Sequence, residues 1–331
     1  MPDGMLALVV VLVLVLAAEF VNGWTDAPNA IATVVATRVL TPQQAVAMAA
    51  VLNLAGALVT GTAVALTVGK GIIRPEVIDL SVVAAAMLSI IVWSTFAWRL
   101  GLPTSESHAL IAGLSGAGLA AAGPDVLLWQ GWQKVLMGLG FSTLLGFSAA
   151  LVLMVGLYWL LRRASPVTTR RSFGRLQILS SAFMAFSHGS NDGQKFMGVF
   201  ALALVLGGRL GEFAVPLWVV LLCGTVMAVG TAVGGWRIMR TMGFKITRLE
   251  PVHGFAAETA ASFAILLASR LGIPLSTTHT INISIMGVGA SRRFSAVRWG
   301  VTRRIVAAWL LTFPVCALLG GLMALLLKRV F

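Results

Sequence analysis

Charged residues are scarce in this chain. Asp, Glu, Lys and Arg make up 11% of its 331 residues, whereas a soluble domain carries about 25%. Apolar residues make up 58%, and the mean hydropathy is +0.94. This shortage of charge excludes an ordinary soluble domain and predicts an all-α protein that crosses the membrane many times.

Cysteine is scarce as well. The two cysteines, Cys223 and Cys316, lie in apolar stretches without metal-ligand spacing, which excludes a disulfide framework and a zinc site. We interpret them as small buried apolar residues. No Lys or Arg precedes the first apolar run, so this run is expected to be a transmembrane segment and not a cleaved signal peptide.

Acidic residues are few, 11 against 24 Lys and Arg, and the net charge is +13. In a membrane protein such an excess is typical of cytoplasmic loops, so no nucleic-acid partner is expected. Stretches of about 20 apolar residues cross the hydrocarbon. The sequence predicts ten of them, at 5–37, 45–67, 77–97, 103–122, 133–161, 175–208, 214–235, 252–269, 275–290 and 300–327.

Most of the basic residues fall in the loops on one side of these spans. That bias places those loops in the cytoplasm and both termini outside the cell membrane, which we take to be a bacterial inner membrane. The only long polar stretch is "RRASPVTTRRSFGR" at 162–175. It is predicted to be a cytoplasmic linker between a first repeat over 1–161 and a second repeat over 176–331.

An internal repeat supports this division. "RLGLPTSESHALIAGLSGAG" (99–118) aligns without a gap on "RLGIPLSTTHTINISIMGVG" (270–289), and eight of the twenty positions match. "FVNGWTDAPN" (20–29) aligns more weakly on "FSHGSNDGQK" (186–195). With five spans in each half, the second copy enters the membrane from the opposite side. Inverted repeats of this kind are typical of secondary transporters.

Carboxylates inside predicted spans are costly and mark functional sites. Asp26 and Asp192 are related by the repeat, and helix breakers flank both: Gly23 and Pro28 in one case, Gly189 and Gly193 in the other. The sequence therefore predicts interrupted helices or re-entrant segments at the midplane, around a transport site. The alternative is a pair of buried structural carboxylates at helix crossings.

The motifs "LPTSESH" and "IPLSTTH" each place a proline and then hydroxyls at the start of an apolar segment. Unpaired N–H groups at a helix start, together with these hydroxyls, form a donor-rich site for an oxyanion. Ordinary N-capping by Ser or Thr is the simpler alternative for either copy alone.

These segments resemble the signatures of the inorganic phosphate transporter (PiT) family, in its compact bacterial form. "NGWTDAPNAIATVVATR" and "HGSNDGQKFMGV" are similar to one pair of family motifs, and "GLPTSESH" and "GIPLSTTH" to a second pair. The resemblance implies symport of inorganic phosphate with Na⁺ or H⁺, and no enzyme activity or cofactor. Its acidic positions match Asp26, Asp192 and Glu258, and its amides match Asn29 and Asn191.

The chain departs from the family pattern in several places. Thr25 stands where the family has Asn, and Lys195 stands opposite Asn29 in the repeat. Glu258 has no acidic counterpart, because the offset of the repeat leads to Met87, and Glu106 stands opposite Thr277. The two halves are therefore chemically unequal, and the number of cation sites stays open.

Phosphate suits neutral donors, and carboxylates would repel it unless cations neutralise them. We therefore assign the coupling cation, with Na⁺ as one candidate, to Asp26, Asp192 and Glu258. Lys195 is either a phosphate ligand or, as we favour, an ion partner of Asp192 or Glu106. His108 and His279 either fix helix packing or carry protons, and Asn22, Thr25 and Glu106 are auxiliary. The predicted phosphate ligands are Asn29, Ser105, Ser107, Asn191, Gln194, Ser276, Thr277 and Thr278.

The predicted function is thus secondary active import of phosphate by alternating access. A sulfate or metal–phosphate symporter of the same fold is the alternative, while a passive anion channel and an intramembrane hydrolase are more remote. The hydrolase lacks an oxyanion elbow and metal-ligand spacing, and a channel needs no paired carboxylates. The sequence leaves the oligomeric state open, with a homodimer as one candidate.

Overall fold

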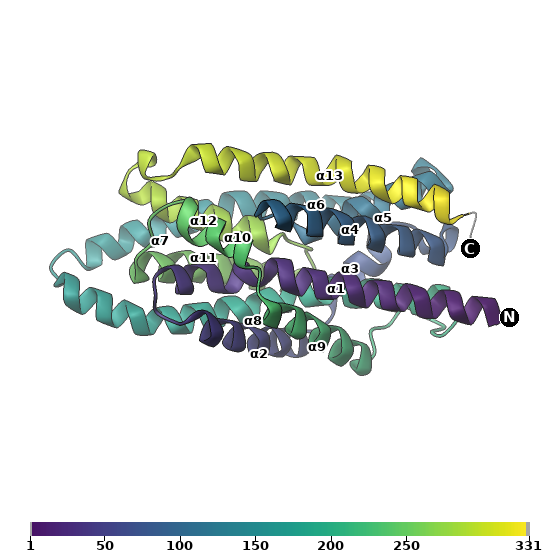
Figure 1. Cartoon of the computed structure of the whole chain (residues 1–331), viewed down its shortest axis with the longest axis horizontal. Helices are drawn as coiled ribbons and strands as arrows, with labels where there is room; N and C mark the ends of the chain where they lie inside the picture. The colour runs from purple at the N-terminus through teal and green to yellow at the C-terminus, as the bar shows by residue number, and fades with distance from the viewer. Residues whose placement is uncertain (1, 329–331) are drawn as a thin grey trace.

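The computed structural model describes residues 2–328, and within that range it contains helices and no strand (Figure 1). The α-helices are α1 (Pro2–Ala36), α2 (Pro42–Val59), α3 (Ala63–Gly71), α4 (Leu80–Leu100), α5 (Glu106–Ala122), α6 (Trp129–Gly140), α7 (Gly146–Leu160), α8 (Pro166–Leu206), α9 (Leu217–Val233), α10 (Trp236–Arg240), α11 (Pro251–Arg270), α12 (Thr277–Arg292) and α13 (Trp299–Leu327). Short 3₁₀ turns are η1 (Pro75–Val77), η2 (Pro124–Val126) and η5 (Phe294–Ala296), and π-helical turns are η3 (Phe141–Leu145) and η4 (Thr241–Lys245).

The same helix signals recur in the two halves of the chain. Asp79 caps α4 by accepting hydrogen bonds from the backbone of Ser81 and Val82, and Glu250, at the matching position, caps α11. These caps satisfy N–H groups that a helix start leaves unpaired. Gly101 (φ +67°) follows α4, and Gly272 (φ +64°) stands at the matching place after α11. The positive φ favours glycine and turns the chain out of the helix.

Among residues 2–328, six helices are long and apolar enough to cross a membrane, or seven if the bent pair α9 and α10–η4 counts as one span. The ten predicted spans are therefore only partly matched. The predicted span 45–67 is divided into α2 and α3, and α5 and α12 are too short to qualify. Helix α8 is long but does not pass the same hydropathy test, because its centre carries the run Ser187–Lys195.

The breaks expected around Asp26 and Asp192 are not present. Helix α1 continues through Pro28, and α8 continues from Pro166 to Leu206. Pro28 removes one backbone donor and crowds the carbonyl one turn earlier, and a glycine inside a helix costs about 1 kcal/mol, but neither ends these helices. The predicted linker 162–175 is also largely helical, because Ser165 caps α8 and Pro166 occupies its first position.

A buried polar layer separates the two largest apolar clusters of the core. Along α1, Ala18 belongs to the first cluster and Ala32 to the second, and buried polar residues lie between them. Along α8, Met184 belongs to the second cluster and Phe196 to the first, again with polar residues between. The fold thus places a polar layer across α1 and α8 where they pass the middle of the molecule.

The first residues of α1 and the last residues of α13 lie at the same end of the elongated helical body, and the turn between α7 and α8 lies at the other end (Figure 1). Large apolar side chains are exposed along the helices, among them Val13, Phe96, Leu144 and Leu318. Such a surface suits lipid and not water. The chain is a multi-pass membrane protein.

Candidate functional site

The N-termini of α5 and α12 meet in the interior. The Ser107 hydroxyl donates a hydrogen bond to the Leu275 carbonyl (3.1 Å), and the rings of His108 and His279 lie 4.5 Å apart between centroids. Ser105 and Ser276 cap the two helices by accepting from the backbone N–H groups of His108 and His279, each at 3.2 Å. The first-turn N–H groups of both helices therefore point to the same region.

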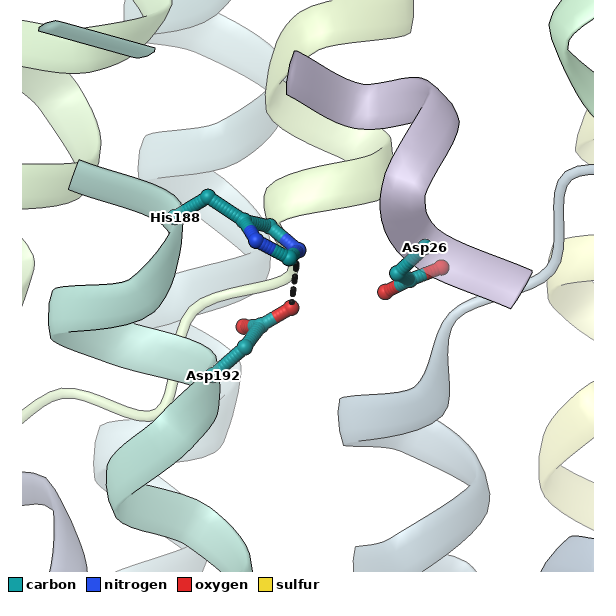
Figure 2. A group of neighbouring side chains, drawn as sticks. All are labelled: Asp26, His188 and Asp192. Carbon is teal, nitrogen blue, oxygen red and sulfur yellow. Dashed lines mark ion pairs between the residues drawn. The ribbon is translucent and has the colours of Figure 1, made fainter. Parts of the chain in front are cut away.

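Asp192 lies beside these helix starts. One carboxylate oxygen accepts a hydrogen bond from the Thr277 hydroxyl at 2.7 Å and lies 3.1 Å from His188 Nε2 (Figure 2). The other oxygen accepts from the Lys195 ammonium. Asp192 is buried and partnered by three side chains from α8 and α12.

Asp26 approaches from α1. Both of its carboxylate oxygens accept from the Thr278 hydroxyl, at 3.1 and 3.2 Å. The Asn29 amide, one turn later on α1, donates to the hydroxyls of Thr277 (3.2 Å) and Thr278 (3.0 Å). Two adjacent threonines of α12 therefore connect the two repeat-related carboxylates.

The carboxylates of Asp26 and Asp192 and the ring of His188 face one another (Figure 2). One ligand atom of each lies within 4.8 Å of the others, which is close enough to surround one cation. His188 Nδ1 lies 3.2 Å from the Asn53 side-chain oxygen, which orients the ring. The group therefore combines two carboxylates and an imidazole, a donor set that suits a metal ion or a proton.

Lys195 is completely enclosed. Its ammonium donates to the carboxylate of Asp192, to the Ser107 hydroxyl and to the Leu275 carbonyl, the last at 2.9 Å. An ammonium has three hydrogens, and each has an oxygen partner. The structure therefore pairs Lys195 with Asp192 and not with Glu106.

Glu106 forms a neighbouring site on the side of the first repeat. Its carboxylate accepts from the Thr25 hydroxyl (2.9 Å) and the Ser94 hydroxyl (2.5 Å). Thr25 immediately precedes Asp26 on α1, so this hydrogen bond places Glu106 beside the segment that carries Asp26, and both carboxylates are buried. No Lys or Arg side chain among residues 2–328 forms an ion pair with either of them.

The structure does not bring Glu258 into this group. Its carboxylate accepts from the hydroxyls of Thr33 and Ser180 and from the Gln177 amide, the last at 3.2 Å. Thr33 lies seven residues after Asp26 on α1, which is about 10 Å along a helix. Glu258 therefore forms a separate buried polar cluster.

Other predicted ligands also point elsewhere. Asn191 donates to the Ser269 hydroxyl and the Ile273 carbonyl, and Gln194 accepts from the Val64 backbone at the start of α3. Asn22 donates to Glu19. The contacts of Asn191 and Gln194 fix α8 against its neighbours, and the contact of Asn22 lies within α1.

His108 and His279 lie behind the site in an aromatic group. His279 stacks on Trp309 with centroids 3.8 Å apart, and His108 packs 4.5 Å from Phe313. Within the described chain, neither ring nitrogen of His279 has a hydrogen-bond partner. Their observed contacts are packing contacts.

Sequence reasoning assigned no role to His188 and missed Thr33, Gln177 and Ser180. A signal was available for α1, where Glu19, Asn22, Asp26, Asn29 and Thr33 follow one another at spacings of three and four residues. That spacing predicts a polar stripe on one helix face, and all five residues are buried. The partners of Glu258 on α8 give no such signal.

Two basic pockets flank the segments that lead to the helix starts. One, of about 740 Å³, includes Lys70, Lys134 and Arg270 in its lining, and another, of about 380 Å³, includes Arg99 and Arg237. The Thr67 hydroxyl donates to the Gly272 carbonyl in the first, and the Thr241 hydroxyl donates to the Gly101 carbonyl in the second. The pockets are thus related by the repeat, and their charge attracts anions.

A family model described as the phosphate transporter family matches residues 22–171 and 162–320. The chain belongs to this family. The matched ranges contain Asp26, Asp192, Lys195 and both helix starts, and together they cover most of the chain.

Two relatives from bacteria are similar to this chain over most of its length. A probable low-affinity inorganic phosphate transporter of Rhizobium meliloti is 48% identical over 92% of this chain and 91% of its own length. One of Bacillus subtilis, with the same description, is 38% identical over 99% of this chain and 100% of its own length. These relatives are described as transporters, and the family is one of transporters and not of enzymes.

A solved structure titled "The sodium-dependent phosphate transporter" has a similar fold. Its TM-score is 0.81 and its sequence identity 26%, over 98% of this chain and 100% of that one. The likeness extends over the whole helical body and includes the segments that carry the site.

Proposed function

We propose that this chain imports inorganic phosphate by symport with Na⁺ or H⁺, at the site between Asp26, Asp192 and the starts of α5 and α12. One observation carries the proposal: the buried side chains of Asp26, Asn29 and Asp192 all bind the hydroxyls of Thr277 and Thr278. These two threonines begin α12, next to the start of α5. The descriptions of the relatives and of the similar structure support phosphate as substrate and sodium as one coupling ion.

The shared hydroxyls explain how cation and anion are coupled. A threonine hydroxyl has one hydrogen, and Thr277 and Thr278 direct theirs to Asp192 and Asp26. A positive charge or a proton on each carboxylate takes over the role of its hydrogen bond from threonine and removes its negative charge. The hydroxyls can then donate to phosphate, so each ligand strengthens the binding of the other.

The helix starts supply further donors. The N–H groups of Glu106, Ser107, Thr277 and Thr278 belong to the first two positions of α5 and α12, where no intrahelical acceptor exists. Both helix dipoles add positive potential at the same place. Ser105, Ser276, Asn191 and Gln194 support this site through caps and packing.

The repeat provides the route for transport. We propose ten membrane crossings in two inverted halves, over 1–161 and 176–331, with the first turns of α8 as part of the link. The two basic pockets then open to opposite sides, and rocking of one half against the other gives each of them access in turn.

The first prediction concerns coupling. Purified protein in liposomes should accumulate phosphate only when an inward Na⁺ or H⁺ gradient is imposed, because the carboxylates must be neutralised before the anion binds. Uptake of labelled phosphate is measured with each gradient alone, with both and with neither, and empty liposomes serve as the control. Equal accumulation with both gradients abolished contradicts symport.

The same assay distinguishes the substrate. Sulfate is tested as a competitor, because it has a similar shape but no titratable proton at neutral pH. A divalent metal is added in a further arm, because Asp26, His188 and Asp192 form a group that suits such an ion. Stronger uptake of sulfate than of phosphate assigns the site to a sulfate symporter. Phosphate uptake that requires the metal assigns it to a metal–phosphate symporter.

The second prediction concerns topology. Single cysteines at Ser165, before α8, and at Lys328, after α13, should react with an impermeant maleimide from opposite sides of the membrane. We expect Ser165 to face the cytoplasm and the two termini to lie outside. Cys223 and Cys316 are buried and serve as the unlabelled background. Labelling of both positions from one side contradicts the inverted arrangement. The last residue, Phe331, lies outside the described residues.

A further inference from the structure

The oxygen cage around the Lys195 ammonium has the composition of a cation site. It contains the carboxylate of Asp192, the hydroxyl of Ser107 and the backbone carbonyl of Leu275. Hard cations such as Na⁺ are bound in proteins by the same oxygen types. The ammonium thus stands where a free cation would find its ligands.

The repeat shows what stands at the equivalent place in the other half. Lys195 corresponds to Asn29, and Ser107 corresponds to Thr278. The contacts correspond as well, because Lys195 donates to Ser107 and Asn29 donates to Thr278. Asn29 is uncharged, so the carboxylate of Asp26 has no cationic side chain at the place that corresponds to Lys195.

A second exchange adds to the charge difference between the two sides. Thr277 donates to Asp192, whereas its counterpart Glu106 accepts from Thr25, the residue before Asp26, and so adds a second carboxylate on that side. With all groups ionised, the side of Asp26 carries two negative charges, and the side of Asp192 carries one negative and one positive charge. The negative charge that mobile cations must balance therefore lies on the side of Asp26 and Glu106.

We propose that the ammonium of Lys195 is a tethered cation, which replaces one mobile coupling cation at Asp192 and leaves mobile cations only for the side of Asp26 and Glu106. The inference rests on the proposed function, since it concerns how many cations accompany phosphate. Because Lys195 belongs to the chain, it neutralises Asp192 without being transported. Its replacement by Asn, the residue at the equivalent place, should open a second mobile site.

The test counts the cations that bind with phosphate. The dissociation constant of inorganic phosphate is measured by calorimetry on folded, detergent-purified protein, over a series of Na⁺ concentrations at fixed pH and over a pH series at fixed Na⁺. Because Kd falls as the cation concentration rises, the slope of log Kd against log cation concentration is negative, and its magnitude gives the number of cations taken up per phosphate. Gel filtration confirms that each variant is folded, and Lys195→Gln is a second neutral variant with a longer side chain.

We expect the magnitude of the slope for the coupling cation to increase by about one in Lys195→Asn or Lys195→Gln, with phosphate binding recovered at high cation concentration. Lys195→Arg retains the charge and should keep the slope of the unmodified protein. An unchanged slope in both neutral variants overturns the tethered cation, as does a complete loss of phosphate binding that no cation concentration restores. A slope of zero in the unmodified protein is a different result, because it contradicts the proposed coupling itself.

Discussion

Asp26→Asn should reduce gradient-driven phosphate uptake to the level of empty liposomes while the protein stays folded and inserted. Asn preserves the size of the side chain and an oxygen that can accept from Thr278, but it removes the negative charge that holds the mobile cation. Loss of a charge-assisted interaction of about 1.5–3 kcal/mol lowers binding by roughly 10- to 100-fold, and the anion loses affinity with it by linkage.

Asp192→Asn should be equally damaging for a related reason. It leaves the Lys195 ammonium buried without its carboxylate, which is costly in a low-dielectric interior. Uptake and phosphate binding are measured for both variants, and gel filtration reports folding. Asp125→Asn removes a carboxylate from an exposed turn and serves as the matched control. Near-normal gradient-driven phosphate uptake in Asp26→Asn contradicts a coupling role and indicates that Asp26 and Asp192 are structural carboxylates.

Gly189→Ala should destabilise the protein and abolish transport without touching a polar group. Gly189 packs against the backbone of α2, where an added Cβ would lie 2.0 Å from the Asn53 carbonyl oxygen. The equivalent Gly23 packs in the same way against Met227 of α9, at 2.3 Å. Helices α2 and α8 must separate to accept the methyl group, at a cost of about 1–3 kcal/mol or more.

The separation also displaces the neighbouring His188, which Asn53 orients. We expect a lower melting temperature in detergent and loss of driven uptake. Gly174→Ala is the control on the same helix, because no atom lies within 4 Å of its added Cβ, and it should be neutral or slightly stabilising. Equal melting temperatures for the two variants contradict the close backbone contact.

The parts of the fold that depend on local signals could be predicted from the sequence. The proline and hydroxyl patterns predicted helices from the 103–122 and 275–290 segments, and α5 and α12 start at Glu106 and Thr277. Pro28 and the glycines of α8 misled the prediction of breaks, because tertiary packing outweighs local propensity. Lateral packing keeps both helices continuous.

Side-chain partners across the molecule could not be predicted. The resemblance to the family implied that Glu258 acts together with Asp26 and Asp192, but its distance from them depends on where α11 packs against α1 and α8. His188 contacts Asn53, 135 residues away in sequence, and nothing local indicates such a pair. The ion pair of Lys195 with Asp192 has a spacing of three residues, which a helix brings together, so this partner was accessible to sequence reasoning.

The most direct test of cation-coupled phosphate binding is the affinity of the purified protein for phosphate as a function of cation concentration, measured without any membrane gradient. Calorimetry is performed at increasing Na⁺ with pH fixed, and at decreasing pH with Na⁺ fixed. We predict that the dissociation constant for phosphate falls as one of these two cations increases, and that Asp26→Asn removes this dependence. A dissociation constant that is independent of both cations in the unmodified protein contradicts the coupling of cation and anion at this site.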